Sequence, residues 1–138
     1  MTTSKPPHTA IVTCMDPRVR LPGVLGDAAA ASFVLRNGGG RVTDDVLRSL
    51  VLCTRLLGVT DVGVVHHTDC RLQAVSNEEL ILKTGVDIDF MPISDPLASV
   101  LEDVGRLRSG GALSPQVTVW GGLYSVEDHT MRVIAGTP

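Results

Sequence analysis

The sequence predicts an α/β fold in which a central parallel sheet is flanked by helices. Its 138 residues are 43% hydrophobic but only 3% aromatic, so aliphatic side chains must fill the core. Branched aliphatic residues, together with 14 glycines, are typical of parallel strands buried on both faces. Segments with strand character also alternate with segments of helical character. This alternation predicts a parallel sheet with right-handed crossovers.

Short β-branched runs predict the strands. They cover residues 9–13, 32–36, 62–66, 87–91, 117–120 and 131–134. The first run leads directly into Cys14 and the third into His67. In an open parallel sheet the chemistry lies beyond the carboxyl ends of the strands, so we expect these two side chains at one edge of the sheet.

Helical spacing and capping residues predict the helices. Thr43 is a suitable N-cap for a helix over 44–57, and Gly58 is a natural stop. Asp95 is the predicted cap of a second helix over 96–108, which has a proline at its first position. A short helix is predicted over 77–83.

The remaining segments are predicted as loops and turns. Prolines and a glycine after Cys14 predict a loop over 15–25, followed by a short helical turn within 26–31. Residues 37–40 form a glycine-rich loop, and 126–130 a turn between the last two strands.

Charge and hydropathy exclude several classes of protein. The net charge of −3 gives no electrostatic basis for binding nucleic acid or an anionic membrane. The longest apolar run, residues 28–35, is far shorter than the ~18 residues of a membrane span. The first seven residues lack the apolar core of a signal peptide. We therefore expect a single cytoplasmic domain over 1–138, with residues 1–7 flexible.

Cys14, His67 and Cys70 are the candidate metal ligands. His67 and Cys70 have the H-x-x-C spacing that lets one turn offer two ligands, and adjacent strands lie only ~4.8 Å apart, which would bring Cys14 close. Two thiolates and an imidazole suit Zn²⁺, and three protein ligands leave a fourth position open, as in catalytic sites. The alternative is that both cysteines are structural and the histidine makes a strand-end hydrogen bond.

Asp16 and Arg18 are the candidate catalytic pair. They follow the first ligand closely, and a carboxylate paired with a guanidinium stays ionised. Such a carboxylate could accept a hydrogen bond from a metal-bound hydroxide and orient it. Released from Arg18, Asp16 could instead bind the metal as a fourth ligand and close the site. The alternative is an ordinary surface ion pair in a loop.

Three motifs in this order resemble the β-class carbonic anhydrases, in particular their short bacterial branch. They are residues 14–18 (CMDPR), 36–45 (RNGGGRVTDD) and 66–70 (HHTDC). The resemblance covers residues 9–70. It implies four parallel strands in the order 2-1-3-4, usually with an antiparallel fifth. It also implies Zn²⁺ on Cys14, His67 and Cys70, with Asp16 and Arg18 as the catalytic dyad, in a homodimer or tetramer.

The activity implied is reversible hydration of CO₂ to bicarbonate and a proton by zinc-bound hydroxide. Two alternatives stay open: hydrolysis of carbonyl sulfide or carbon disulfide on the same fold, and a non-catalytic module that binds zinc and bicarbonate. Two positions depart from the pattern. Lys5 stands near where many members have a bicarbonate-binding glutamine, and Arg71 stands where many have glycine. His66 and His8 are weak candidates for a proton shuttle.

Overall fold

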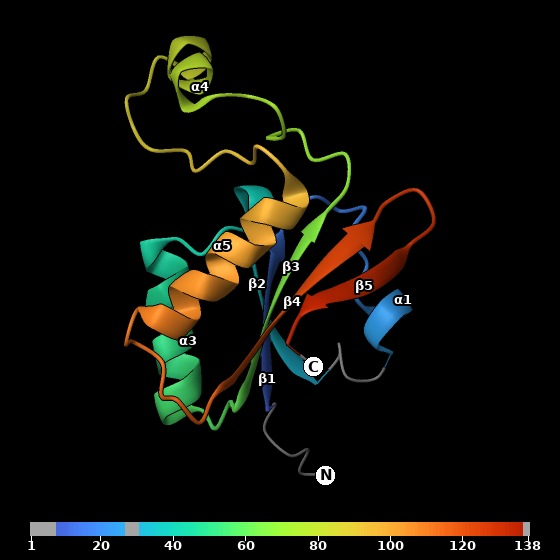
Figure 1. Cartoon of the computed structure of the whole chain (residues 1–138), viewed down its shortest axis with the longest axis vertical. Coiled ribbons are helices and arrows are strands. Elements are labelled where there is room, and N and C mark those ends of the chain that lie inside the picture. The colour runs from blue at the N-terminus through green and yellow to red at the C-terminus, as the bar shows by residue number, and fades with distance from the viewer. Residues whose placement is uncertain (1–7, 27–30, 137–138) are drawn as a thin grey trace, which may run out of the picture.

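The computed structural model, which describes residues 8–26 and 31–136, has a five-stranded sheet with helices packed against it (Figure 1). The strands are β1 (Thr9–Cys14), β2 (Ser32–Asn37), β3 (Asp61–His67), β4 (Thr118–Ser125) and β5 (Thr130–Ala135). Their order is β2-β1-β3-β4-β5, with the first four parallel and β5 antiparallel to β4. The predicted α/β fold class and strand order are confirmed.

The helices are α1 (Pro22–Leu25), α3 (Asp44–Leu56), α4 (Asn77–Thr84) and α5 (Pro96–Ser109), and Gly38–Gly40 form a single 3₁₀ turn. The predicted caps are present. The side chain of Thr43 accepts a hydrogen bond from the backbone N–H of Val46, and that of Asp95 accepts one from Ala98. These caps satisfy backbone donors that the first turn of a helix leaves free.

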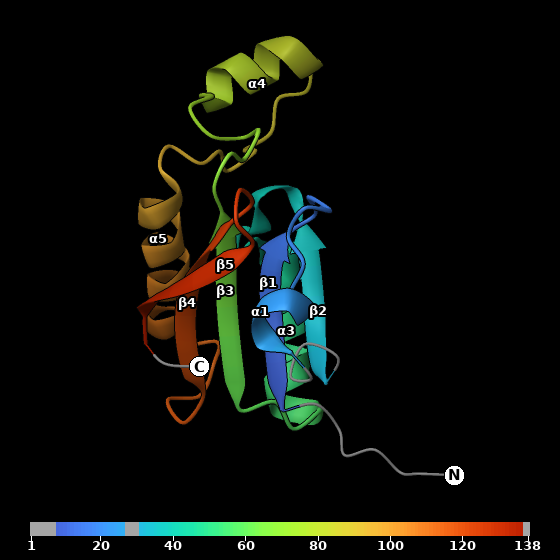
Figure 2. The same cartoon turned by 90° about the vertical axis from the view of Figure 1, so that its right-hand side faces the viewer.

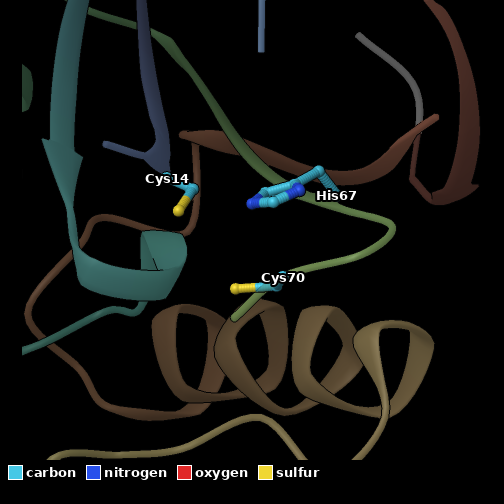
Figure 3. A group of neighbouring side chains, drawn as sticks. All are labelled: Cys14, His67 and Cys70. Carbon is cyan, nitrogen blue, oxygen red and sulfur yellow. The ribbon is translucent and has the colours of Figure 1, made fainter. Parts of the chain in front are cut away.

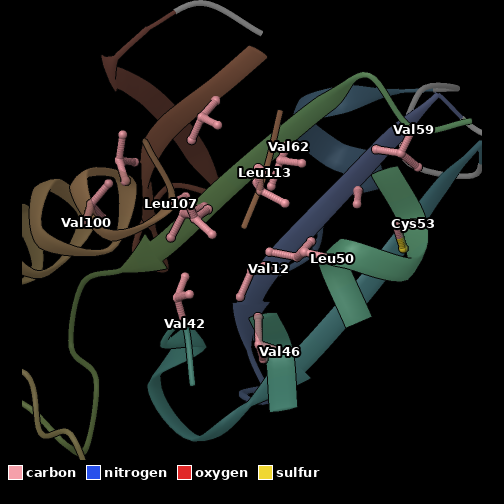
Figure 4. Packing of buried hydrophobic residues seen from close by; sticks show 14 residues of the cluster. Val12, Val42, Val46, Leu50, Cys53, Val59, Val62, Val100, Leu107 and Leu113 are labelled. Atoms are coloured by element: carbon pink, nitrogen blue, oxygen red, sulfur yellow. The ribbon is translucent and has the colours of Figure 1, made fainter. Parts of the chain in front are cut away.

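Both faces of the sheet are covered, as the aliphatic strands predict. Alternate residues of β1 point to opposite faces, so that Val12 packs beneath α3 and α5 while Ile11 packs with Trp120 on the face covered by α1. Figures 2 and 4 show the two faces and the larger cluster, in which Leu50 of α3 meets Val12. This core fixes the strand ends that carry the site.

Three expectations differ from the structure. Residues 87–91 form no strand, because this segment lies outside the sheet and the side chain of Asn77 binds its backbone at Ile88 and Phe90. The last parallel strand continues to Ser125 rather than ending at Trp120, because it stays paired with β3 as far as Tyr124 and with β5 as far as Ser125. Pro22–Leu25 are helical rather than loop, and the predicted turn within 26–31 falls mostly outside the described residues.

α4 stands apart from the sheet, as both views show (Figures 1 and 2). The chain leaves and returns through one short contact, in which Gln73 pairs with Ile93. Within the described ranges 8–26 and 31–136, no helix is both long and apolar enough to cross a membrane.

Replacing Gly63 by alanine is expected to lower the free energy of unfolding by about 1–3 kcal/mol, the usual cost of overpacking a core. The reason is that a Cβ at this position of β3 would lie 2.3 Å from the indole ring of Trp120. Urea unfolding of both proteins measures the difference.

Gly105→Ala is the matched control. Gly105 lies inside α5, where a Cβ would meet no atom within 4 Å. Alanine there is expected to stabilise the protein by up to about 1 kcal/mol, because glycine is a poor helix former. Equal losses at the two positions would contradict the packing argument.

Candidate metal centre

The three predicted ligands meet at the carboxyl edge of the sheet. Cys14 ends β1 and His67 ends β3, and the two strands are neighbours. Cys70 follows in a turn that reverses the chain, with Asp69 in the left-handed region at φ 54°. Figure 3 shows the two sulfur atoms and the imidazole ring pointing into one common space.

The geometry of this group fits a metal ion. The candidate ligand atoms of Cys14, His67 and Cys70 all lie within 4.8 Å of one another, and all three residues are buried. Among the described residues, Nε2 of His67 is a buried nitrogen without a hydrogen-bond partner. Its other ring nitrogen, Nδ1, lies 2.6 Å from the carbonyl oxygen of Thr68, which orients the ring with Nε2 toward the sulfur atoms.

The two thiols share a proton. A hydrogen bond from the Cys70 thiol lowers the pKa of Cys14 to about 4, against the opposing effect of burial. The same hydrogen bond raises the pKa of Cys70 far above its usual range, and burial adds to this increase. The pair therefore loses its first proton more readily than a free cysteine does, and its second proton less readily.

We therefore expect zinc binding to release a proton from this pair of cysteines. Zinc takes cysteine as thiolate, so this proton must leave when the ion enters. Affinity should then rise with pH, by about tenfold per pH unit for each proton released. Competition titrations at pH 6.5 and 7.5 measure this slope, and calorimetry in two buffers of different ionisation enthalpy counts the protons. A pH-independent affinity would contradict the shared proton.

Asp16 is fixed beside the cluster by Arg18. The guanidinium binds both carboxylate oxygens, with Nη2 2.7 Å from Oδ2 and Nε 3.1 Å from Oδ1. These hydrogen bonds lower the pKa of Asp16 to about 2, although partial burial opposes the shift. Oδ2 of Asp16 lies 3.9 Å from Nε2 of His67. Asp16 is thus an ionised hydrogen-bond acceptor beside the cluster. It is paired with Arg18, which is the arrangement in which it does not itself bind the metal.

Two further residues of the site did not follow from sequence reasoning. Asp69 accepts a hydrogen bond of 2.9 Å from Arg18, which is thereby held from both sides. Arg36 binds the carbonyl oxygens of Cys14 and Val19, at 2.7 and 2.9 Å, and so fixes the loop that carries Asp16. Asp69 and Arg36 both lie within the three motifs, and this was the only indication in the sequence that they belong to the site.

The cluster opens into a pocket of about 690 Å³. Asp16 and Arg18 line it, as do Gly39 of the glycine turn, Leu72 and the exposed Arg71. The pocket therefore contains the predicted ligands, the predicted catalytic pair and the unusual arginine. Lys5 falls outside the described residues.

The other histidines and the third cysteine lie elsewhere. His66 is fully buried behind the cluster, with its ring between Ser99 and the carbonyl oxygen of Gly40, so it does not face the pocket. His129 binds the hydroxyl of Tyr124, and His8 is exposed at the start of β1. Cys53 is a buried core residue of α3.

Comparison with known proteins identifies the family. The carbonic anhydrase family model matches residues 9–88. β-Carbonic anhydrase 1 of Mycobacterium tuberculosis is 38% identical over 115 residues, covering 80% of this chain and 69% of that protein. The chain belongs to the β-carbonic anhydrase family, as the resemblance of its motifs predicts.

Two further relatives place the chain within that family. The solved carbonic anhydrase of Streptococcus mutans superimposes with a TM-score of 0.86 at 38% identity, covering 97% of this chain and 86% of that one. A carbon disulfide hydrolase of Saccharolobus solfataricus is 33% identical over 153 residues, covering 88% of this chain and 74% of that protein. The family fold therefore occurs with two kinds of substrate.

Proposed function

We propose that this protein catalyses the reversible hydration of CO₂ to bicarbonate and a proton with one zinc ion held by Cys14, His67 and Cys70. The observation that carries the proposal is the juxtaposition of three buried ligand atoms within 4.8 Å of one another and an ionised carboxylate at the same pocket. Zinc in such a site would act as a Lewis acid that lowers the pKa of a bound water toward ~7.

Asp16 supplies the orientation that the reaction needs. Its carboxylate lies 3.9 Å from the ligating nitrogen of His67 and is positioned to accept a hydrogen bond from the attacking oxygen. Arg18 holds both carboxylate oxygens, so the acceptor points one way before substrate arrives. A preorganised acceptor of this kind costs no reorganisation during the reaction.

The pocket suits a small uncharged substrate and an anionic product. Its wall includes Leu72 and the side-chain-free Gly39, beside which CO₂ can approach the cluster. Arg71 is exposed at the same pocket, and its positive charge favours an anion such as bicarbonate. Hydroxide attack on carbon disulfide also gives an anion, so this charge fits both reactions and does not by itself separate the two substrates.

Carbon disulfide or carbonyl sulfide hydrolysis is the second candidate, because a carbon disulfide hydrolase is 33% identical to this chain. The test uses zinc-loaded protein in two assays: stopped-flow CO₂ hydration with a pH indicator, and sulfide release from each sulfur gas. Fast CO₂ hydration that chelation abolishes and zinc restores supports the proposal. Rapid sulfide release without CO₂ hydration would replace it with the second candidate, and inactivity in both assays would favour a binding module.

We also propose a homodimer, or a tetramer built from it. β2 is an edge strand of the sheet, and Val34 on this strand is exposed. Leu52 and Leu56 of α3 are exposed as well. Light scattering of the zinc-loaded protein measures the state, and a monomer at micromolar concentration would contradict this proposal.

A further inference from the structure

Four polar side chains form a buried cluster directly behind the metal ligands. They are Arg41, His66, Ser99 and Asp103, each at most 4% exposed. They come from three separate parts of the fold: the end of the glycine turn, β3 and α5. Burying charged groups is costly, and an apolar contact of the same size would often be at least as stable. The cluster therefore calls for an explanation beyond packing.

Asp103 of α5 is the centre of this cluster. Its Oδ2 accepts hydrogen bonds from Nε of Arg41 at 2.8 Å and from the backbone N–H of Val42 at 3.2 Å. The same oxygen lies 3.3 Å from Nε2 of His66. The carboxylate of Asp103 thus contacts two separate parts of the chain. One is the segment just after the glycine turn, and the other is β3, the strand that carries His67.

His66 extends these contacts to the turn itself. Its Nε2 donates to the carbonyl oxygen of Gly40 at 2.8 Å, and its Nδ1 lies 2.7 Å from the hydroxyl of Ser99. The ring is therefore fixed at both nitrogens. Gly40, which has no side chain of its own to anchor it, is held through its carbonyl oxygen.

The glycine turn touches a metal ligand. Gly40 adopts φ +67°, and a Cβ there would lie 2.8 Å from the backbone nitrogen of Cys14, so the two backbones are in direct contact. Gly39 of the same turn lines the pocket together with Cys14. The position of the turn therefore constrains where the backbone of Cys14, and with it the sulfur, can lie.

We propose that Asp103, acting through Arg41 and His66, is a positioning residue that holds the glycine turn against Cys14 and so fixes this sulfur for the metal. The inference rests on the metal-dependent function proposed above. Outer residues that orient a ligand typically change metal affinity or activity by about 10–100-fold when they are replaced.

The test compares Asp103→Asn with Glu102→Gln. Glu102 is the neighbouring residue on α5 and binds the same guanidinium, Nη2 of Arg41 at 3.0 Å, but its side chain is 71% exposed. Zinc release from the loaded protein to a chelator is expected to be about 10–100-fold faster in Asp103→Asn and within twofold of the original in Glu102→Gln. With cobalt as the probe, the sulfur-to-cobalt absorption band should shift in Asp103→Asn alone.

Leu107→Ala separates positioning from general destabilisation. Leu107 is buried on α5 within the large apolar cluster, and no polar contact links it to the glycine turn in the described residues. Its loss should lower the unfolding midpoint without changing the cobalt band or the rate of zinc release. Equal rates in Asp103→Asn and Leu107→Ala, or an unmoved band in Asp103→Asn, would overturn the proposal.

Ser99→Ala provides a second test of the same proposal if the Asp103→Asn variant does not fold. Removing this hydroxyl leaves Nδ1 of His66 without its partner and should accelerate zinc release several-fold with a smaller shift of the cobalt band. A wild-type rate and band in this variant would overturn the proposal. Because both readouts report the metal and not turnover, they remain valid even if the protein proves inactive toward CO₂.

Discussion

Replacing Cys70 by alanine is expected to abolish zinc-dependent activity and to weaken zinc binding by on the order of 10²–10³-fold. This figure assigns one ligand about a quarter of the roughly 10–16 kcal/mol with which four-ligand zinc sites bind the ion. Cys70 contributes one of only two sulfur atoms to the cluster, and no other cysteine of the described chain lies near enough to replace it. Metal content after dialysis and competition with a chelator measure the loss.

Cys53→Ala is the control for this experiment. It removes the same atom from a cysteine that is equally buried, 5% against 7% exposed, but packed in α3 away from the cluster. Zinc content and activity should stay near those of the original protein, although stability will fall somewhat. If both substitutions removed zinc, the effect would be one of folding, and the ligand assignment would lose its support.

Asp16→Asn is expected to lower kcat/KM for CO₂ hydration by about 10²–10³-fold while the protein keeps its zinc. Losing one preorganised hydrogen-bonding group at a reacting oxygen typically costs this much. The amide has nearly the shape of the carboxylate but only one acceptor oxygen, so it cannot bind Arg18 through two oxygens and still accept from the attacking oxygen. Stopped-flow assays on samples of equal zinc content measure the effect.

Asp69→Asn is the matched comparison. Asp69 binds the same guanidinium at 2.9 Å, but its side chain is 71% exposed. An exposed ion pair contributes at most about 1 kcal/mol, so the rate should fall by less than about fivefold. If the two substitutions lowered the rate equally, Asp16 would act only by holding Arg18. The proposal that it accepts a hydrogen bond from the attacking oxygen would then be contradicted.

The pH dependence of activity should not originate in Asp16. Its pKa is lowered to about 2 by the hydrogen bonds from Arg18, so the carboxylate is ionised at every pH at which the enzyme is assayed. By linkage, this pair stabilises the fold fully above pH 4 and loses its contribution only as the pH falls toward 2.

The sequence predicted well those features that local patterns determine. Thr43 and Asp95 marked helix starts correctly, because capping depends on one side chain and the next few residues. The predicted ligands Cys14 and His67 could be placed together at the ends of their strands because a parallel sheet brings its carboxyl ends to one edge. Such features need no knowledge of distant parts of the chain.

Tertiary contacts account for the errors. The strand predicted over 117–120 continues through Gly121 and Gly122, where the absence of side chains lets α5 pack closely at Gly121 and Met131 of β5 at Gly122. The run 87–91 has alternating character, yet it has no neighbouring strand and is held instead by Asn77. Asp103 could not be assigned to the metal centre, because its partner Arg41 lies 62 positions away in the chain.

The placement of the proposed ligands on two separate strands also constrains the order of folding and metal binding. His67 and Cys70 are three residues apart in the chain, but Cys14 is brought beside them only by the pairing of β1 with β3. With the proposed ligands, we therefore expect an unfolded chain to bind metal weakly until β1 and β3 have paired. Tight metal binding would then indicate that β1 has paired within the sheet, so the amount of metal retained can serve as a measure of correct folding.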